Sequence, residues 1–255
     1  MSHPLVIANW KMNLPSGGIS GWIQNEMCST NDEINFDKKS AHFKYMGIAP
    51  PISHLSELKE LLNFGFLGAQ DISNFNDGAK TGDISADMVI EKGCSFSILG
   101  HSERREFHNE TNFIVSEKLM ICLEKDLIPV VCIGESFKEY ESGETLHILE
   151  KQIKEIFTSI SSKKRVVIAY EPVWAIGSGK TPSADEVNNI HQHIKDIVQS
   201  IANIDAIDVI YGGSVNCENA KSFFRQKNID GALIGGASLN GKGFLNIYNE
   251  FLEIL

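Results

Sequence analysis

The chain has 255 residues, and its 42% apolar and 22% charged residues are typical of a folded protein with a sizeable core. The net charge of −10 and the absence of any basic run longer than Lys163-Lys164-Arg165 argue against a nucleic-acid or anionic-membrane partner. There is no secretion signal, no apolar run of about 18 residues, and no C-x-x-C pair among the five cysteines, so we expect a cytoplasmic protein with reduced thiols.

Short apolar segments recur along the chain and predict strands. They cover residues 5–10, 43–49, 66–69, 95–99, 128–133, 166–170, 207–211 and 231–234. Longer amphipathic segments lie between them and predict helices, most clearly at residues 112–125, 145–160, 184–201, 218–226 and 243–255. Eight strand–helix alternations in about 250 residues predict an α/β fold, a single-domain (β/α)₈ barrel over residues 1–255, with an open doubly wound sheet as the alternative.

In such a barrel, the loops that follow the carboxyl ends of the strands carry the chemistry. In chain order these loops contain Asn9 and Lys11, Gln70, His101 with Ser102 and Glu103, Cys132 and Glu135, Glu171, Gly212 to Ser214, and Gly235 with Gly236. A carboxylate, an imidazole, an ammonium group and two glycine-rich loops therefore converge on one face of the predicted barrel. We expect the functional site on that face.

The stretch from Ala169 to Lys180 follows the sixth predicted strand. Glu171 ends this strand, and Pro172 prevents it from continuing as a paired element. The apolar residues 173–176 then lie between the proline and two glycines, which suits either a lid that closes over a ligand or a loop that caps the core. Glu171 can be a structural carboxylate paired with an arginine, but its place before a closable apolar segment favours a general base, because expelling water makes a carboxylate more basic.

His101 precedes an apparent helix start, with Ser102 expected near the helix cap. The helix dipole there disfavours imidazolium, so His101 would donate a hydrogen bond as a neutral acid, although a single histidine is more often structural. Lys11 follows a strand end and would be the main positive charge for a phosphate group, with Glu103 as its counter-ion; a solvated lysine is the alternative. No pair of histidines has the spacing of metal ligands, so we expect no metal.

The pairs Gly212-Gly213 and Gly235-Gly236 close the last two predicted strands. Glycine lets backbone N–H groups approach an anion, so these pairs and Gly177 favour a phosphate site, whereas each pair alone could mark a tight turn. The segment Gly179-Lys180-Thr181 resembles the end of a nucleotide P-loop, but Trp174 occupies the position where that motif requires glycine.

Four motifs together closely resemble the triosephosphate isomerase family, and the match extends over the whole chain. They are Asn9-Trp10-Lys11-Met12-Asn13, Gly100-His101-Ser102-Glu103-Arg104-Arg105, the stretch from Ala169 to Lys180, and Tyr211-Gly212-Gly213-Ser214-Val215. The resemblance implies an isomerase of glycolysis and gluconeogenesis that interconverts dihydroxyacetone phosphate and glyceraldehyde 3-phosphate through an enediolate, without a cofactor.

The same resemblance implies a role for each candidate residue. Glu171 would be the base, and neutral His101 would act as electrophile and acid together with Lys11 and Asn9. The phosphate would be held by Gly177, Ser178, Ser214, Gly235 and Gly236, and the supporting residues would be Ser102, Glu103 and Cys132.

The resemblance further implies a homodimer. Residues 71–85 form a segment too long and polar for an ordinary barrel turn, and by resemblance it docks into a second subunit, where Thr81 reaches towards the partner's Asn9 and the partner's Lys11.

Several positions depart from the family pattern without removing a catalytic group. They are Leu14 for Gly, His108-Asn109 for Phe-Gly, Ser178 for Thr, and Lys195 for an Arg that pairs with the acid at Asp230. We expect these changes to affect packing, the subunit interface and stability, and we expect Pro182 to stiffen the end of the lid.

Two other classes of protein remain as alternatives at this point. The first is another phosphate-binding barrel enzyme, such as a lyase or an aldolase-like enzyme that forms a Schiff base at Lys11. The second is a non-catalytic binding protein on the same fold, because a fold alone does not determine function. The presence of Lys11, His101 and Glu171 together argues against the second alternative, since a binding protein needs no general base.

Overall fold

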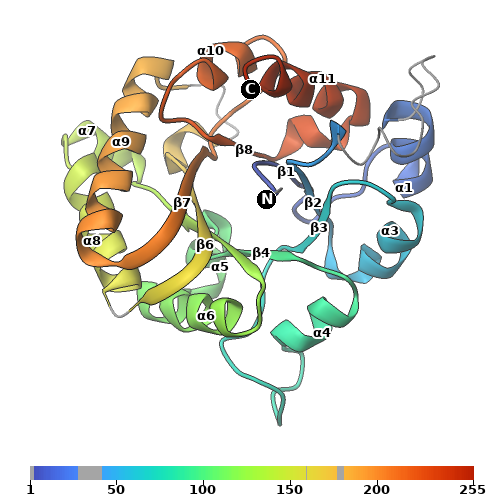
Figure 1. Ribbon diagram of the computed structural model, residues 1–255, viewed down its shortest axis with the longest axis horizontal. Helices are drawn as coiled ribbons and strands as arrows, with labels where there is room; N and C mark the ends of the chain where they lie inside the picture. The colour runs from blue at the N-terminus through green and yellow to red at the C-terminus, as the bar shows by residue number, and fades with distance from the viewer. Residues whose placement is uncertain (1–2, 28–41, 159, 177–180) are drawn as a thin grey trace.

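The computed structural model describes residues 3–27, 42–158, 160–176 and 181–255, and in these residues eight parallel strands close into a barrel (Figure 1). The strands are β1 (Val6–Asn9), β2 (Met46–Ala49), β3 (Phe66–Ala69), β4 (Phe96–Leu99), β5 (Ile128–Ile133), β6 (Ser161–Tyr170), β7 (Asn203–Tyr211) and β8 (Gly231–Ile234). Each strand pairs with the next in the chain, and β1 also pairs with β8, which closes the barrel. The (β/α)₈ fold predicted from the sequence is therefore confirmed.

Helices surround the barrel on its outside (Figure 1). The longer helical segments are η1 (Gly21–Met27), α3 (Leu55–Leu61), α4 (Ala86–Glu91), α5 (Ser102–His108), α6 (Asn112–Glu124), α8 (Thr145–Phe157), α9 (Ala184–Ile201) and α11 (Gly241–Leu252). The shorter ones are α1 (Gly18–Ser20), η2 (Ile52–His54), α7 (Phe137–Glu141), η3 (Val173–Ala175), α10 (Ala220–Phe224) and η4 (Gly236–Leu239). None of the helices in the described part of the chain is long and apolar enough to cross a membrane.

The barrel strands are almost continuously apolar because they are packed on both sides, by the barrel interior and by the helices. All four residues of β1, β2, β4 and β8 are buried. Phe96 fills the interior beside β2 and β3, where a Cβ atom on Gly68 would lie 2.1 Å from the Phe96 ring and one on Gly47 would lie 3.1 Å from it. Small and large side chains thus alternate between neighbouring strands to fill the core.

The structure extends two strands beyond their predicted limits. β6 and β7 begin at Ser161 and Asn203, before the apolar runs that predicted them, and these first residues pair with each other across a register shift between Ser162 and Arg165. The residues of this first part alternate between exposed and half-buried, so its sequence lacks the apolar pattern of a barrel strand. Three predicted helices are also shorter or displaced: α8 ends at Phe157, α10 covers only Ala220–Phe224, and α11 spans Gly241–Leu252.

Two departures from the family pattern have a structural explanation. Asn109 ends α5 in the left-handed conformation, with φ 55° and ψ 35°, and asparagine tolerates this region better than any other residue except glycine. The ammonium group of Lys195 lies 2.8 Å from the carboxylate of Asp230, which also accepts the N–H of Val209. Asparagine and lysine therefore retain the turn and the ion pair for which the family generally uses glycine and arginine.

His191 is fully buried, and its Nδ1 lies 3.3 Å from the carbonyl oxygen of Asn228. Burial lowers the pKa of His191 to about 3, from an ordinary value of 6.5. The unfolded chain therefore binds one more proton than the folded chain between these values, and the free energy of unfolding falls by ~1.4 kcal/mol per pH unit below pH 6.5. At pH 5 the expected loss from this histidine is about 2 kcal/mol.

The measurement is urea unfolding at several pH values between 5 and 7.5. His191→Gln should show a shallower loss of stability below pH 6.5 than the unaltered chain, whereas His147→Gln, at an exposed position on α8, should retain the full slope. Identical slopes for the His191 variant and the unaltered chain would mean that His191 does not carry this pH dependence.

Candidate active site

A cavity of about 240 Å³ opens at the carboxyl ends of the strands, where the sequence predicts the functional site. It is lined by seven of the predicted site residues, namely Asn9, Lys11, His101, Glu171, Ser214, Gly235 and Gly236. Gly177 and Ser178, predicted to bind phosphate, lie outside the described residues. In the described part of the chain, no group of three or more His, Cys, Asp or Glu residues could hold a metal ion.

The carboxylate of Glu171 is buried at the end of β6, with 2% of the residue exposed. Its Oε2 accepts the backbone N–H of Ser102 at 3.0 Å, and its Oε1 lies 3.1 Å from Nε2 of His101. No arginine or lysine forms an ion pair with Glu171 among the described residues. The structural role that the sequence left open for Glu171, pairing with an arginine, is therefore not the one adopted.

Hydrogen bonding determines which nitrogen of His101 carries the proton. Nδ1 accepts the backbone N–H of Glu103 at 3.2 Å, so His101 itself is the N-cap of α5, and Ser102, expected near the cap, is the first residue of the helix. An imidazole nitrogen that accepts a hydrogen bond carries no proton, so a neutral His101 has its proton on Nε2. That proton is directed at Glu171 and towards the cavity.

Lys11 reaches the cavity from a strained backbone conformation with φ 51°. Three contacts fix its position: its N–H donates to Oδ1 of Asn9 at 3.0 Å, its carbonyl oxygen accepts the amide of Gln70 at 2.8 Å, and its ammonium group donates to Glu103 at 2.7 Å. Glu103 is thus the counter-ion predicted from the sequence. The role of Gln70 was not predicted, and the only signal for it is a polar residue directly after an apolar strand.

Two glycines provide the space that Glu171 occupies. A Cβ atom on Gly134 would lie 1.7 Å from the carbonyl oxygen of Glu171, and one on Gly212 would lie 2.7 Å from its Cγ. Because real Cβ atoms do not approach other atoms this closely, any other residue at Gly134 would displace the backbone of Glu171, and any other residue at Gly212 would displace its side chain. Gly212 therefore shapes the site, in addition to any contact with an anion.

Cys132 lies beneath the site and is fully buried. Its burial raises the pKa of the thiol well above the ordinary value, so the group is neutral and apolar, and it lies close to Glu171. Arg105 ties this region to α5, because it donates to the carbonyl oxygens of Gly100 at 2.7 Å and Cys132 at 3.0 Å. These contacts support the floor of the site, and the part played by Arg105 was not predicted.

The predicted phosphate-binding residues that the structure describes, Ser214, Gly235 and Gly236, form the wall of the cavity that follows β7 and β8. Gly236 begins η4, and a Cβ atom placed on it would meet no atom within 4 Å, so its backbone faces open space. The hydroxyl of Ser214 donates to the carbonyl oxygen of Ala175 at 2.7 Å. Ser214 therefore connects this wall to η3, the segment that directly follows Glu171.

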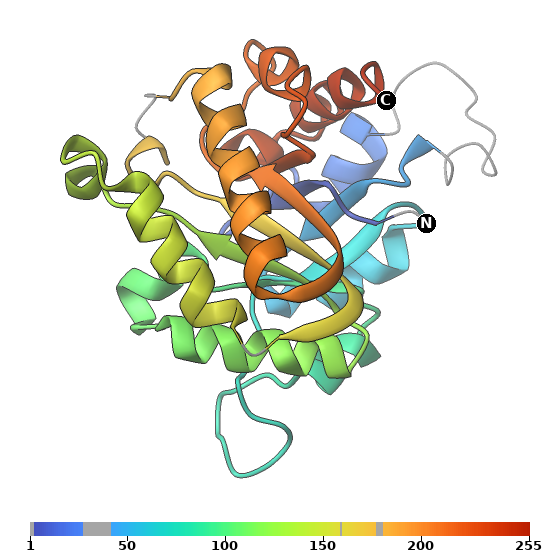
Figure 2. The same ribbon diagram turned by 60° about the vertical axis from the view of Figure 1, so that its left-hand side comes forward.

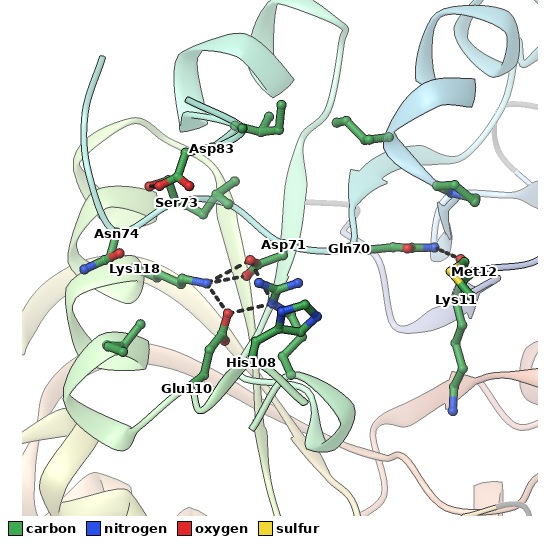
Figure 3. Close-up of a pocket in the computed structure, with 17 residues that line it drawn as sticks. Lys11, Met12, Gln70, Asp71, Ser73, Asn74, Asp83, His108, Glu110 and Lys118 are labelled. Atoms are coloured by element: carbon green, nitrogen blue, oxygen red, sulfur yellow. Dashed lines mark hydrogen bonds and ion pairs between the residues drawn. The ribbon is translucent and has the colours of Figure 1, made fainter. Parts of the chain in front are cut away.

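A second cavity of about 480 Å³ lies on the far side of Lys11, beside the segment from Asp71 to Ser85. In Figure 3 the ammonium group of Lys118 points at the carboxylates of Asp71 and Glu110, and its nitrogen lies 2.6–2.8 Å from their oxygens. Arg104 adds contacts of 2.9 Å to Asp71 and 2.6 Å to Glu110. Burial raises the pKa of Asp71 to about 6, whereas for Glu110 the effect of burial is outweighed by hydrogen bonds from Lys118 and Arg104, which lower its pKa.

The closed barrel with carboxylate, imidazole and ammonium groups at its carboxyl-terminal mouth defines the class of the chain, that of the (β/α)₈-barrel enzymes. Comparison with known proteins identifies the family. Residues 4–251 match the family model described as triosephosphate isomerase. The chain belongs to the triosephosphate isomerase family.

The sequence matches to similar proteins extend over almost the whole chain. A protein of Sodalis glossinidius named triosephosphate isomerase is 39% identical over 262 residues, which cover 99% of this chain and 98% of that protein. Proteins with the same name from Psychrobacter cryohalolentis and Mycoplasmopsis pulmonis are each 40% identical, and each comparison covers 97% of both chains. These findings confirm the resemblance and the isomerase class inferred from the sequence.

Proposed function

We propose that this chain interconverts dihydroxyacetone phosphate and glyceraldehyde 3-phosphate by moving a proton between adjacent carbons, with Glu171 as the base and neutral His101 as the electrophile. The observation that carries the proposal is the pairing of the Glu171 carboxylate with the Nε2–H of His101 at 3.1 Å, in a cavity that also contains Lys11. Asn9 completes the catalytic set, and Glu103 and Ser102 support it.

The proposed reaction needs no cofactor, because each proton and electron pair that moves stays within the substrate, Glu171 and His101. Glu171 removes a proton from the carbon next to the carbonyl, and the electron pair of that bond moves to the carbonyl oxygen to give an enediolate. The Nε2–H of His101 and the ammonium group of Lys11 stabilise the negative oxygen, and His101 passes a proton between the two oxygens. Glu171 then returns its proton to the neighbouring carbon, which completes the isomerisation.

The phosphate group would bind at the wall that follows β7 and β8, through backbone N–H groups of Gly235, Gly236 and Ser214, with Gly177 and Ser178 included in the proposal on the family resemblance. This group does not react, so its binding energy is free to bring Glu171 and the segment that follows it into the reactive arrangement. Exclusion of water there would also protect the enediolate from losing phosphate.

The surroundings of Lys11 favour this reaction over the Schiff-base alternative. Its nitrogen donates a hydrogen bond to Glu103 at 2.7 Å, so it is held against a carboxylate and is not free to attack a carbonyl carbon. The test is incubation with glyceraldehyde 3-phosphate followed by borohydride and mass spectrometry. We expect conversion to dihydroxyacetone phosphate with no change in the mass of the protein, and a covalent adduct on Lys11 would contradict the isomerase mechanism.

We also propose that the chain acts as a cytoplasmic homodimer, in which the loop between β3 and α4 docks into the other subunit, with Thr81 reaching towards the partner's Asn9 and the partner's Lys11. Figure 2 shows that this loop extends away from the barrel, and Thr81 lies in its exposed part. Hydrogen bonds from Ser73 to Asp83 at 2.6 Å and to Ile84 at 2.8 Å close its base, so the loop has a defined shape.

Two exposed apolar side chains line a neighbouring hollow, which is also lined by Asn9, Lys11 and His101. Met12 is 95% exposed and Phe107 is 69% exposed, which supports their burial by a second subunit. Sedimentation at micromolar concentration should give twice the chain mass of 28.2 kDa, and Thr81→Arg should weaken the association at least tenfold, while Lys138→Ala, at an exposed position on α7, leaves it unchanged. A monomer with full activity would contradict this part of the proposal.

A further inference from the structure

Trp174, in the turn that follows Glu171, is held by the segment that follows β5. Its indole N–H donates to Oε1 of Glu135 at 2.9 Å, and the backbone N–H of the preceding Val173 donates to the carbonyl oxygen of Glu135 at 3.0 Å. The ring of Tyr140 stacks on the indole, with 4.2 Å between ring centroids and 27° between planes. The edge of the indole, its face and the backbone of the residue before it are thus each fixed by a separate contact.

Tyr140 is itself held in place, so that it can fix the position of Trp174. It lies on α7, a single helical turn whose Ser136 and Glu139 form a reciprocal capping box. Its hydroxyl is hydrogen-bonded to Glu186 in the first turn of α9. Tyr140 therefore connects η3, which follows Glu171, to the helix that begins after Ser183.

The position of Trp174 is coupled to that of Glu171, because only Pro172 and Val173 separate them. The ring of Pro172 fixes its N–Cα torsion, with φ −62°. Glu171 and Trp174 therefore cannot move independently of each other. In the arrangement described above, Glu171 accepts the Nε2–H of His101. A substrate oxygen needs that same N–H, so Glu171 has to leave this position before the reaction, and η3 has to shift with it.

We propose that Tyr140 is a positioning residue for the catalytic base: its stack on Trp174 stabilises the resting arrangement in which Glu171 is bound to His101 and Ser102, and this stack is broken when substrate binds. The inference rests on the proposed role of Glu171. Tyr140 does not line the catalytic cavity. Through Trp174, however, it would determine the fraction of molecules that are ready to bind substrate.

Removal of the ring should therefore strengthen ligand binding. A stacked aromatic pair contributes enough to change an equilibrium about two- to tenfold, and weakening the resting arrangement raises the fraction of binding-competent molecules by the same factor. We expect Tyr140→Ala to lower KM for glyceraldehyde 3-phosphate, and the inhibition constant of inorganic phosphate, by two- to tenfold, with a smaller change in kcat. A residue with a merely structural role would lower thermal stability and leave both constants unchanged.

Three further variants identify the responsible group. Tyr140→Phe retains the ring and should keep both constants within twofold of the unaltered chain, although it loses the bond to Glu186. Tyr140→Leu fills the space without a flat ring and should behave as Tyr140→Ala does, which covers the case in which the alanine variant does not fold. Lys138→Ala, at an exposed position on the same helix, should change neither constant.

Phosphate binding followed by tryptophan fluorescence separates this inference from the proposed reaction. The fluorescence change on adding inorganic phosphate should be complete at lower concentrations in Tyr140→Ala, and this readout needs no turnover. An inhibition constant and KM unchanged in both Tyr140→Ala and Tyr140→Leu would overturn the inference, as would equal effects of Tyr140→Phe and Tyr140→Ala. Failure of the unaltered chain to convert substrate would instead refute the role proposed for Glu171.

Discussion

Glu171→Gln should lower kcat by about 10³-fold or more, while the affinity for inorganic phosphate stays within a few-fold of the original value. An amide cannot remove a proton from carbon, and loss of a positioned general base costs about 10²- to 10⁴-fold in rate. The amide has nearly the same size as the carboxylate and can still accept the N–H of Ser102, which binds Glu171 at 3.0 Å. The fold and the proposed phosphate-binding wall at Gly235 and Gly236 should therefore survive the change.

The measurement combines steady-state kinetics with calorimetric titration of inorganic phosphate. Thermal unfolding serves as the control for folding, since Glu171 is buried and a poorly folded variant would also lose activity. If turnover and phosphate binding were lost to the same extent in a folded sample, Glu171 would be a binding residue and the assignment of the base would be wrong.

Lys118→Met should lower the free energy of unfolding by about 3–5 kcal/mol, because it removes one partner from a buried group of charges. Lys118 is 3% exposed and donates to both oxygens of Asp71 and to Glu110, as Figure 3 shows. Without this ammonium group, Arg104 alone faces two carboxylates. Urea unfolding at pH 7 and at a fixed protein concentration measures the loss, since association of subunits also stabilises the folded state.

Lys125→Met is the matched control, because Lys125 ends the same helix and pairs with Asp87 at 2.6 Å on the surface. Exposed ion pairs contribute little to stability, so this variant should unfold at nearly the same urea concentration as the unaltered chain. Equal effects of the two substitutions would show that the buried network does not contribute more than a surface pair.

The fold could be predicted because its strands and helices have strong, regular patterns. Parallel strands buried on both sides are short apolar runs, and eight of them alternating with amphipathic segments leave few other architectures for a chain of this length. The outer parts of β6 and β7 could not be predicted in this way. They pair through their backbones outside the core, where Ser161 and Asn203 need not be apolar.

The position of the candidate site could be predicted because its residues follow strand ends, where Asn9, His101 and Glu171 all lie. The contacts that position them could not, because they join residues far apart in the chain. Gln70 reaches the backbone of Lys11 across 59 positions, and Tyr140 reaches Trp174 only once the barrel has closed. Likewise, the capping of α5 by the ring of His101 depends on a rotamer that the sequence does not reveal.

The central claim is that this site isomerises a triose phosphate by proton transfer without a metal, and one assay tests it directly. Purified protein is supplied with glyceraldehyde 3-phosphate, with and without a chelator, and the formation of dihydroxyacetone phosphate is followed by NMR. We expect rapid conversion at the same rate in both samples. No conversion by a folded protein, or conversion that stops when the chelator is added, would contradict the account.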